Sequence, residues 1–399
     1  MATEPKKPVH KKPVQKKPVQ KKPVQKQPAS KKPVKHTEPV HTAKKKPAPK
    51  NNAKKKRTKI VLFVLEIFIL LIMVVVLYSV FKIEKVGKVN LPQEEFVINP
   101  EVEEKVETTM KGYRNVALFG VDSTSGALTK NTRSDTIMIA SINQDTGECK
   151  LVSVYRDTYL NLSNDSYNKC NSAYAKGGPM QAINMLNMNL DMNIKDFITV
   201  GFAGLSNTVD ALGGIMIDID DVELKHINNY QKTMASDMKR EYTPVESTGY
   251  QLLDGLQATA YCRIRYGGGD DFKRTERQRE VLLAIFEKAK SASPATLTAA
   301  VNAIFDNDEI YTSLDVADIL DILGDITKYE VVAQGGFPEE SRRTTGTIGS
   351  KGSCVVPVSL ADNVQWLHEF LFEDEEYSPS DAVIEYSNKV EADTSGYVK

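Results

Sequence analysis

Arginines and acidic residues recur together through the middle of the chain, at spacings that suit a phosphorylated substrate. They fall in five short stretches, which are Gly120–Asp122, Arg133–Thr136, Arg156–Thr158, Arg263–Arg265 and Asp271–Gln278. The planar guanidinium group binds phosphate oxygens through two parallel hydrogen bonds, so several arginines together can hold a pyrophosphate. Carboxylates such as Asp122 and Asp135 suit a Mg²⁺ ion, or Mn²⁺ in its place, that bridges phosphate oxygens.

Ordinary surface ion pairs are the competing interpretation of these residues, and for any single pair it is the better one. The five stretches together favour a binding site, because they fall at predicted strand ends, turns and one helix start, where functional residues concentrate. A strand through Arg263 and Arg265 would point both side chains to one face. Arg274, Arg277 and Gln278 are one helical turn apart, so two of them can share a face.

Other common catalytic arrangements are missing from the sequence. Only His226 and His368 of the five histidines lie outside the first 59 residues, which argues against a histidine-based zinc site and most Ser-His-Asp arrangements. No Gly-x-Ser-x-Gly, Walker or Gly-x-Gly-x-x-Gly motif occurs. The four cysteines, Cys149, Cys170, Cys262 and Cys354, form no Cys-x-x-Cys pair and leave open whether they are reduced or form up to two disulfides.

The elements that must position these residues alternate between strands and helices. Apolar runs predict strands at 115–121, 137–142, 149–154, 197–202 and 215–219, with a hairpin turn at 145–147. Helical patterns cover 180–189, 205–212 and 275–290, and 257–265 is helical or mixed. This order predicts an α/β (α+β) sandwich over residues 113–375, with a central mixed β-sheet flanked by helices. Residues 82–112 are expected to be a linker, and the acidic residues 376–399 a flexible tail.

The formal net charge of zero conceals two oppositely charged parts. Residues 1–59 contain 20 lysines, one arginine and two glutamates, so they carry +19 and the remainder carries −19. Between the two parts lies the apolar run Ile60–Phe81, whose 22 residues reach about 33 Å as a helix, enough for a hydrocarbon core of about 30 Å. The basic residues before it predict a single-pass type II membrane protein, with a cytoplasmic N-terminus and the 113–375 domain outside the cell.

The basic tail repeats a five-residue unit of the type Lys-Lys-Pro-Val-Gln through residues 6–35. Proline at every fifth position prevents a regular helix and the like charges repel, so residues 1–59 are expected to be disordered and extended. Anionic membrane lipids are the expected partner, because the tail precedes the membrane segment. A specific nucleic-acid partner is not expected, since the tail has no aromatic residue to stack on a base.

At these residues the chain resembles the LytR-CpsA-Psr (LCP) family. The resemblance covers roughly residues 110–375 and is carried by Leu118–Asp122, Arg133–Thr136, Ser153–Thr158, Lys169–Gly178, Val209–Gly214, Arg263–Arg265 and Asp271–Gln278. It implies an enzyme of the bacterial envelope. Such a phosphotransferase moves a glycopolymer from a polyprenyl-pyrophosphate carrier to the C6 hydroxyl of muramic acid in peptidoglycan.

The resemblance also implies roles for single residues. Asp271 would orient or deprotonate the acceptor hydroxyl, with Arg156 and Arg265 as the other catalytic residues. Asp122 and Asp135 would hold Mg²⁺. The pyrophosphate would lie on six side chains, namely Arg133, Arg156, Arg263, Arg265, Arg274 and Gln278. The prenyl chain would need an apolar groove between sheet and helices, which no motif locates.

Two other functions are compatible with the same residues. One is a regulatory protein, a transcriptional attenuator or a binder of polyprenyl phosphate; the basic tail, however, has no helix-turn-helix and few apolar residues to fold around. The other is a pyrophosphatase that uses water in place of a wall hydroxyl. The products distinguish them, because only a transferase yields wall-linked polymer.

Overall fold

The computed structural model of the chain describes residues 87–88, 91–122, 128–129, 131–266, 270–305 and 310–398. The predicted tail 1–59 and the predicted membrane helix 60–81 lie outside these residues. Within the described residues, no helix combines the length and the apolar character that crossing a bilayer requires.

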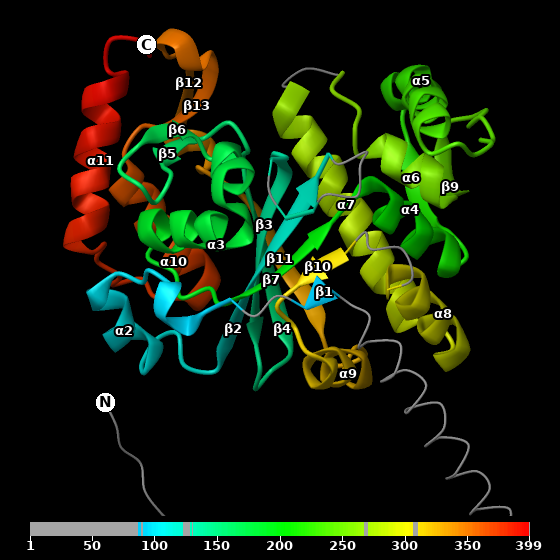
Figure 1. Ribbon diagram of the computed structural model, residues 1–399, viewed down its shortest axis with the longest axis horizontal. Coiled ribbons are helices and arrows are strands. Elements are labelled where there is room, and N and C mark those ends of the chain that lie inside the picture. The colour runs from blue at the N-terminus through cyan, green and yellow to red at the C-terminus, as the bar shows by residue number, and fades with distance from the viewer. Residues whose placement is uncertain are drawn as a thin grey trace, which may run out of the picture. The chain divides into compact units, whose positions relative to one another are not determined.

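A mixed seven-stranded sheet forms the centre of the domain, in the order β1-β10-β7-β2-β3-β4-β11 (Figure 1). Its strands are β1 (Gly87–Lys88), β2 (Tyr113–Val121), β3 (Ser134–Asn143), β4 (Glu148–Val154), β7 (Asp196–Val200), β10 (Ile310–Thr312) and β11 (Glu330–Phe337). β2, β3 and β4 pair antiparallel, whereas β7 and β11 run parallel to their neighbours β2 and β4. The predicted strands at 115–121, 137–142, 149–154 and 197–202 are therefore confirmed, with boundary shifts of a few residues.

Helices flank the sheet on both faces (Figure 1). On one side are α3 (Asn171–Leu190), α10 (Leu360–Phe372) and α11 (Asp381–Thr394), and on the other are α4 (Phe202–Ala211), α5 (Asp221–Asp237), α6 (Gly255–Tyr261), α7 (Asp270–Lys290) and α8 (Pro294–Phe305). Alternate side chains of β2 point to opposite faces of the sheet and pack against different helices. Ala117 and Phe119 pack in the main core with α3, and Leu118 packs on a separate cluster that Leu282 of α7 also contacts. The predicted class, a central mixed sheet flanked by helices, is confirmed.

Shorter elements complete the domain. Three hairpins pair β5 (Tyr159–Asn161) with β6 (Tyr167–Lys169), β8 (Ile215–Ile219) with β9 (Gly249–Leu253), and β12 (Arg343–Thr347) with β13 (Ser353–Pro357). The remaining helices are α2 (Pro100–Val106), α9 (Val316–Gly324) and the 3₁₀ turns η1 (Gln93–Glu95), η2 (Glu340–Arg342) and η3 (Gly349–Lys351). β8 confirms the predicted strand at 215–219, and its apolar residues join a second core with α4, α5 and α6.

The expected flexible tail at 376–399 is wrong for most of its length. Helix α11 spans Asp381–Thr394 and buries Val383 and Val390 completely or nearly so. Its N-terminal turn is fixed by the buried carboxylate of Asp191, which accepts hydrogen bonds from the backbone N–H and the hydroxyl of Ser380 at 2.8 and 2.7 Å. The sequence prediction counted the acidic residues and missed the apolar stripe between them.

The described part of the expected linker at 82–112 is also integrated into the domain. Val102 of α2 and Met110 after it lie in the main core with 1% and 2% of their surface exposed. Asn99, the residue before α2, donates to the same Asp191 carboxylate that holds α11. Residues 91–112 are thus a structural part of the domain.

Candidate active site

A β-bulge positions the central acidic residue of the site. In the β2–β3 ladder Gly120 pairs with Thr136 and Val121 pairs with Ser134, so Asp135 is the extra residue between them. A bulge of this kind redirects a side chain and is common beside functional sites. Gly120 permits the close approach of the strands, because a Cβ there would lie 2.8 Å from Cβ of Thr136.

Three arginines from separate segments converge on Asp135. Its Oδ1 accepts from Arg156 Nη1 at 3.0 Å, and its Oδ2 accepts from Arg274 Nη2 at 2.9 Å and lies 3.6 Å from Arg265 Nη2. Burial opposes ionisation of this carboxyl, but the charges of Arg274 and Arg156 outweigh burial and lower its pKa below the ordinary value. The carboxylate is therefore ionised at neutral pH and holds the arginines in one cluster.

Asp271, the candidate for orienting the acceptor hydroxyl, lies within the same cluster. Its Oδ1 is 3.1 Å from Arg156 Nη2 and 3.8 Å from Arg274 Nη1. Buried donors in the cluster remain without hydrogen-bond acceptors among the described residues, namely Nε of Arg156 and Nε and Nη1 of Arg274. An unsatisfied buried donor costs about 1–3 kcal/mol. An anion arriving here, with oxygens on several sides, would satisfy them together.

Arg263 follows α6 (Gly255–Tyr261) in an irregular segment, so the strand considered for Arg263 and Arg265 does not form. Both side chains nevertheless reach the acidic residues. Arg263 stacks on the ring of Phe202, 4.6 Å from its centroid, and its Nη2 is 4.0 Å from Asp122 Oδ2. Phe202, at the start of α4, belongs to the site without any motif that could have identified it.

Arg277 does not face the cluster, although it lies between Arg274 and Gln278 in the sequence. Its Nε donates to Glu223 Oε1 at 2.7 Å, and its two Nη atoms donate to the backbone carbonyls of Ile264 and Tyr266 at 3.1 and 3.3 Å. The side chain therefore fastens the segment that carries Arg263 and Arg265. Sequence reasoning missed this buried pair, because Glu223 lies in α5, 54 positions away.

Arg133 is the one predicted arginine with no contact to the other site residues in the part of the chain that the structure describes. It directly precedes β3, is exposed, and makes no ion pair or side-chain hydrogen bond with any described residue. The structure thus brings together eight of the nine predicted site residues, which are Asp122, Asp135, Arg156, Arg263, Arg265, Asp271, Arg274 and Gln278.

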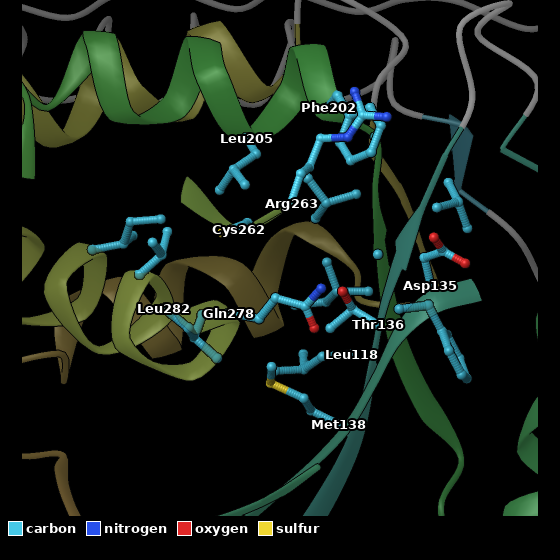
Figure 2. Close-up of a pocket in the computed structure, with 18 of the residues that line it drawn as sticks. Leu118, Asp135, Thr136, Met138, Phe202, Leu205, Cys262, Arg263, Gln278 and Leu282 are labelled. Atoms are coloured by element: carbon cyan, nitrogen blue, oxygen red, sulfur yellow. The ribbon is translucent and has the colours of Figure 1, made fainter. Parts of the chain in front are cut away.

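An apolar groove opens beside the cluster, between the sheet and helices α4 and α7 (Figure 2). It encloses about 230 Å³. Its polar end holds Asp135, Arg263, Arg274 and Gln278, and its apolar walls include Leu118, Met138, Ile198, Phe202, Leu205, Leu282 and Ile285. Charged groups at one end and hydrocarbon walls along the rest match the two parts of a lipid phosphate.

The cysteines are all free and buried. Cys170 and Cys262, which would brace the pocket wall if bonded, form no disulfide here. Cys262 lines the groove, and burial raises the pKa of its thiol to about 12. These cysteines are therefore packing residues, with no ionised thiol at neutral pH.

The acidic residues fit a magnesium ion only together with a phosphorylated substrate. Among the described residues, no group of three or more His, Cys, Asp and Glu side chains is arranged to hold a metal. Mg²⁺, however, is commonly bound by one or two carboxylates with substrate phosphates and water as the other ligands. Asp122 is suited to this role, because its side chain is 46% exposed and only loosely paired with Arg263.

Comparison with known proteins yields consistent matches. A model described as the LytR_cpsA_psr family matches residues 80–351. A polyisoprenyl-teichoic acid–peptidoglycan teichoic acid transferase, TagU of Enterococcus faecalis, is 32% identical over 204 residues, which are 50% of this chain and 62% of that protein. Biofilm regulatory protein A of Streptococcus mutans is 28% identical over 239 residues, 55% of this chain and 57% of that protein. The matches thus span less than two thirds of these relatives.

Solved structures share the fold. A crystal structure from Enterococcus faecalis, titled as a transcriptional regulator, superimposes with a TM-score of 0.55 at 25% identity and covers 73% of this chain and 98% of that one. A structure titled TagT bound to LI-WTA has a TM-score of 0.53 at 23% identity, covering 67% of this chain and 93% of that one.

Proposed function

Because the chain belongs to the LytR-CpsA-Psr family, we propose that it transfers a glycopolymer from a polyprenyl-pyrophosphate carrier to peptidoglycan. The observation that carries the proposal is the apolar groove with the arginine–aspartate cluster at one end. A prenyl chain fits the hydrocarbon walls, and the pyrophosphate then meets the buried guanidinium donors that have no acceptor. The names of relatives that act on polyisoprenyl-linked teichoic acid and peptidoglycan support this choice.

The reaction joins the acceptor hydroxyl to the phosphorus that carries the sugar and breaks the bond from that phosphorus to the bridging oxygen. The acceptor becomes a phosphodiester and the carrier leaves as polyprenyl phosphate. Arg156, Arg265 and Arg274 stabilise the negative charge on both phosphates, so catalysis is mainly positioning and electrostatic stabilisation. Asp271, held by Arg156, orients the hydroxyl and takes its proton.

A magnesium ion held by Asp122 and Asp135 would add further neutralisation of the pyrophosphate. Asp135 is fully engaged by arginines in the free protein. When phosphate oxygens attract those arginines, the carboxylate becomes available as a ligand. The catalytic domain acts outside the membrane in this proposal, with the span 60–81 as its anchor and the tail 1–59 on anionic lipid in the cytoplasm.

The test uses the full chain in detergent with Mg²⁺, a short-chain polyprenyl-pyrophosphate sugar and an uncrosslinked peptidoglycan oligomer. Mass spectrometry should detect a phosphodiester-linked sugar on the oligomer. Arg265→Ala should lower the rate of transfer strongly. Arg342→Ala is the control, because it removes an exposed arginine that is not one of the site residues, and it should leave the rate unchanged. Full transfer by Arg265→Ala would refute the arginine assignment.

Regulation is the second candidate function, and the names of the regulatory relatives favour it. The same assay distinguishes the candidates. A lipid-binding regulator gives no product, a pyrophosphatase gives free sugar phosphate, and a transferase gives wall-linked sugar.

A further inference from the structure

A second cavity is lined by Tyr155 and Phe272, the sequence neighbours of Arg156 and Asp271, and is used by none of the steps above. It encloses about 530 Å³ and is lined by Tyr155, Phe272, Lys273, Glu276, Arg279, Gly335, Gly336, Glu339, Glu340, Arg343 and Trp366. We call it the Arg279 cavity. Its walls come from α7, from β11 and from the neighbouring segments that carry Arg343 and Trp366.

Two pairs of adjacent residues separate the Arg279 cavity from the candidate active site. Arg156 and Asp271 contact each other on the active-site side, with 3.1 Å between Nη2 and Oδ1. Their sequence neighbours Tyr155 and Phe272 contact each other on the cavity side, with ring centroids 4.6 Å apart. A ligand in the cavity would thus lie next to the residues that position the acceptor hydroxyl.

The helical period of α7 explains why one helix serves both sides. Arg274 and Gln278 are four residues apart and line the groove. Phe272, Glu276 and Arg279 follow the same period on another face and line the Arg279 cavity.

Arg279 is a buried cation that makes no hydrogen bond and no close ion pair among the described residues, although Glu276 and Glu280 attract it at longer range. Only 8% of its surface is exposed, and its Nε and Nη1 have no hydrogen-bond acceptor. The acidic residues nearest to it in the helix are already engaged, because Glu276 pairs with Lys273 at 2.7 Å and Glu280 accepts from Tyr261 at 2.5 Å. A buried guanidinium with free donors favours a carboxylate or phosphate as its ligand.

The other walls suit a sugar ring. The guanidinium of Arg343 lies 4.1 Å from the ring centroid of Phe272, and Trp366 stands half-buried at the cavity. Gly335 and Gly336 let the aromatic residues approach β11, because a Cβ at Gly336 would lie 2.1 Å from Tyr155 Oη. Aromatic walls with a few polar groups at fixed positions are typical of sites for small organic ligands, and the C–H faces of sugars pack on such walls.

We propose that the Arg279 cavity binds an anionic unit of a glycan that takes part in the reaction, with its acidic group on Arg279. The proposal rests on the proposed function, which supplies two such glycans. One is the acceptor strand of peptidoglycan, in which a muramic acid without a stem peptide carries a free carboxylate, and the other is the transferred polymer with its phosphates.

Trp366 makes the proposal directly measurable, because it is the only tryptophan of the chain and it lines the cavity. The full chain in detergent is titrated while tryptophan emission is recorded. The probes are the N-acetylglucosamine–N-acetylmuramic acid disaccharide, the same disaccharide with its carboxyl reduced to an alcohol, and a short glycerol-phosphate oligomer. Arg279→Gln is compared with Lys290→Gln, a basic residue of the same helix outside the cavity.

We expect a saturable emission change with one of the anionic probes and weaker binding of the carboxyl-reduced disaccharide. Arg279→Gln should raise the dissociation constant of the anionic probe at least about tenfold, because hydrogen bonds to charged groups are lost. Lys290→Gln should not. A response to the disaccharide assigns the cavity to the acceptor, and a response to the phosphate oligomer assigns it to the transferred polymer.

The proposal is overturned if neither anionic probe changes the emission, or if the reduced disaccharide binds as tightly as the native one. The comparison of probes uses the unmodified chain, so a folding defect of Arg279→Gln would not leave it undecided. Binding does not require transfer. A chain that binds the probe but forms no product would therefore refute the proposed function and leave the cavity assignment standing.

Discussion

Replacement of Glu223 by Gln tests how the segment carrying Arg263 and Arg265 is held. Glu223 and Arg277 form an ion pair of 2.7 Å in which the two side chains are only 8% and 6% exposed. Glutamine keeps the shape and can still accept from the backbone N–H of Asp220, as Glu223 Oε2 does at the start of α5. The substitution therefore removes the charge and replaces the oxygen that accepts from Arg277 Nε with a donor NH2 group.

The expected loss of stability is large because the cation stays behind. Removing one partner of a buried ion pair costs about 3–5 kcal/mol, since the other charge is left uncompensated. In a folded unit of this size, each kcal/mol of lost stability lowers the melting temperature by about 2 °C, so the melting temperature should fall by about 6–10 °C. The double variant Glu223→Gln/Arg277→Met should recover part of it, because an apolar replacement of both partners is often close to neutral.

Differential scanning calorimetry of the full chain measures the change. The matched control is Asp325→Asn, which breaks the exposed pair of Asp325 with Lys328 and should leave the melting temperature unchanged. If the melting temperature of Glu223→Gln equals that of the wild type and the control, the Glu223–Arg277 pair does not stabilise the fold. If Glu223→Gln is destabilised but transfers at the normal rate, the pair stabilises the fold and is not needed to position Arg263 and Arg265.

Three further outcomes are expected. Leu282→Trp fills the wall of the apolar groove and should raise KM for the polyprenyl donor several-fold with little change in melting temperature; an unchanged KM would argue against lipid in the groove. Burial lowers the pKa of His368 to about 4 from 6.5, so the unfolded chain takes up this proton first. The contribution of neutral His368 to the free energy of unfolding should be fully present above pH 6.5 and should decrease by up to about 3 kcal/mol as the pH falls to 4. Denaturant titrations should show a smaller decrease for His368→Gln. A chain ending at residue 375 should lose cooperative unfolding by circular dichroism, because α11 buries Val383 in the core; a sharp transition at the normal temperature would contradict this.

Local patterns were sufficient for the strands β2, β3, β4, β7 and β8. The apolar runs of β2, β3 and β4 predicted strands, because a buried strand needs little more than a short apolar run between turn residues. The failures fell where burial depends on distant residues. The acidic composition of 376–399 concealed the valines of α11, and the polar partners of Asp191 come from the two ends of the domain.

The sequence by itself determined which residue types were available for the site. Arginines and carboxylates in ordered stretches, without histidine or nucleotide motifs, indicated phosphate chemistry before any fold was known. It also set the charge division between residues 1–59 and the rest, because composition needs no contacts to be counted.

Only the tertiary structure decided which of these side chains face one another. The bulge at Asp135 gathers Arg156, Arg265 and Arg274, and the ion pair with Glu223 turns Arg277 away from them. The apolar groove exists only because a sheet and two helices from separate parts of the chain leave space between them. Side-chain direction at long sequence separation is fixed by packing, and packing is a property of the whole folded domain.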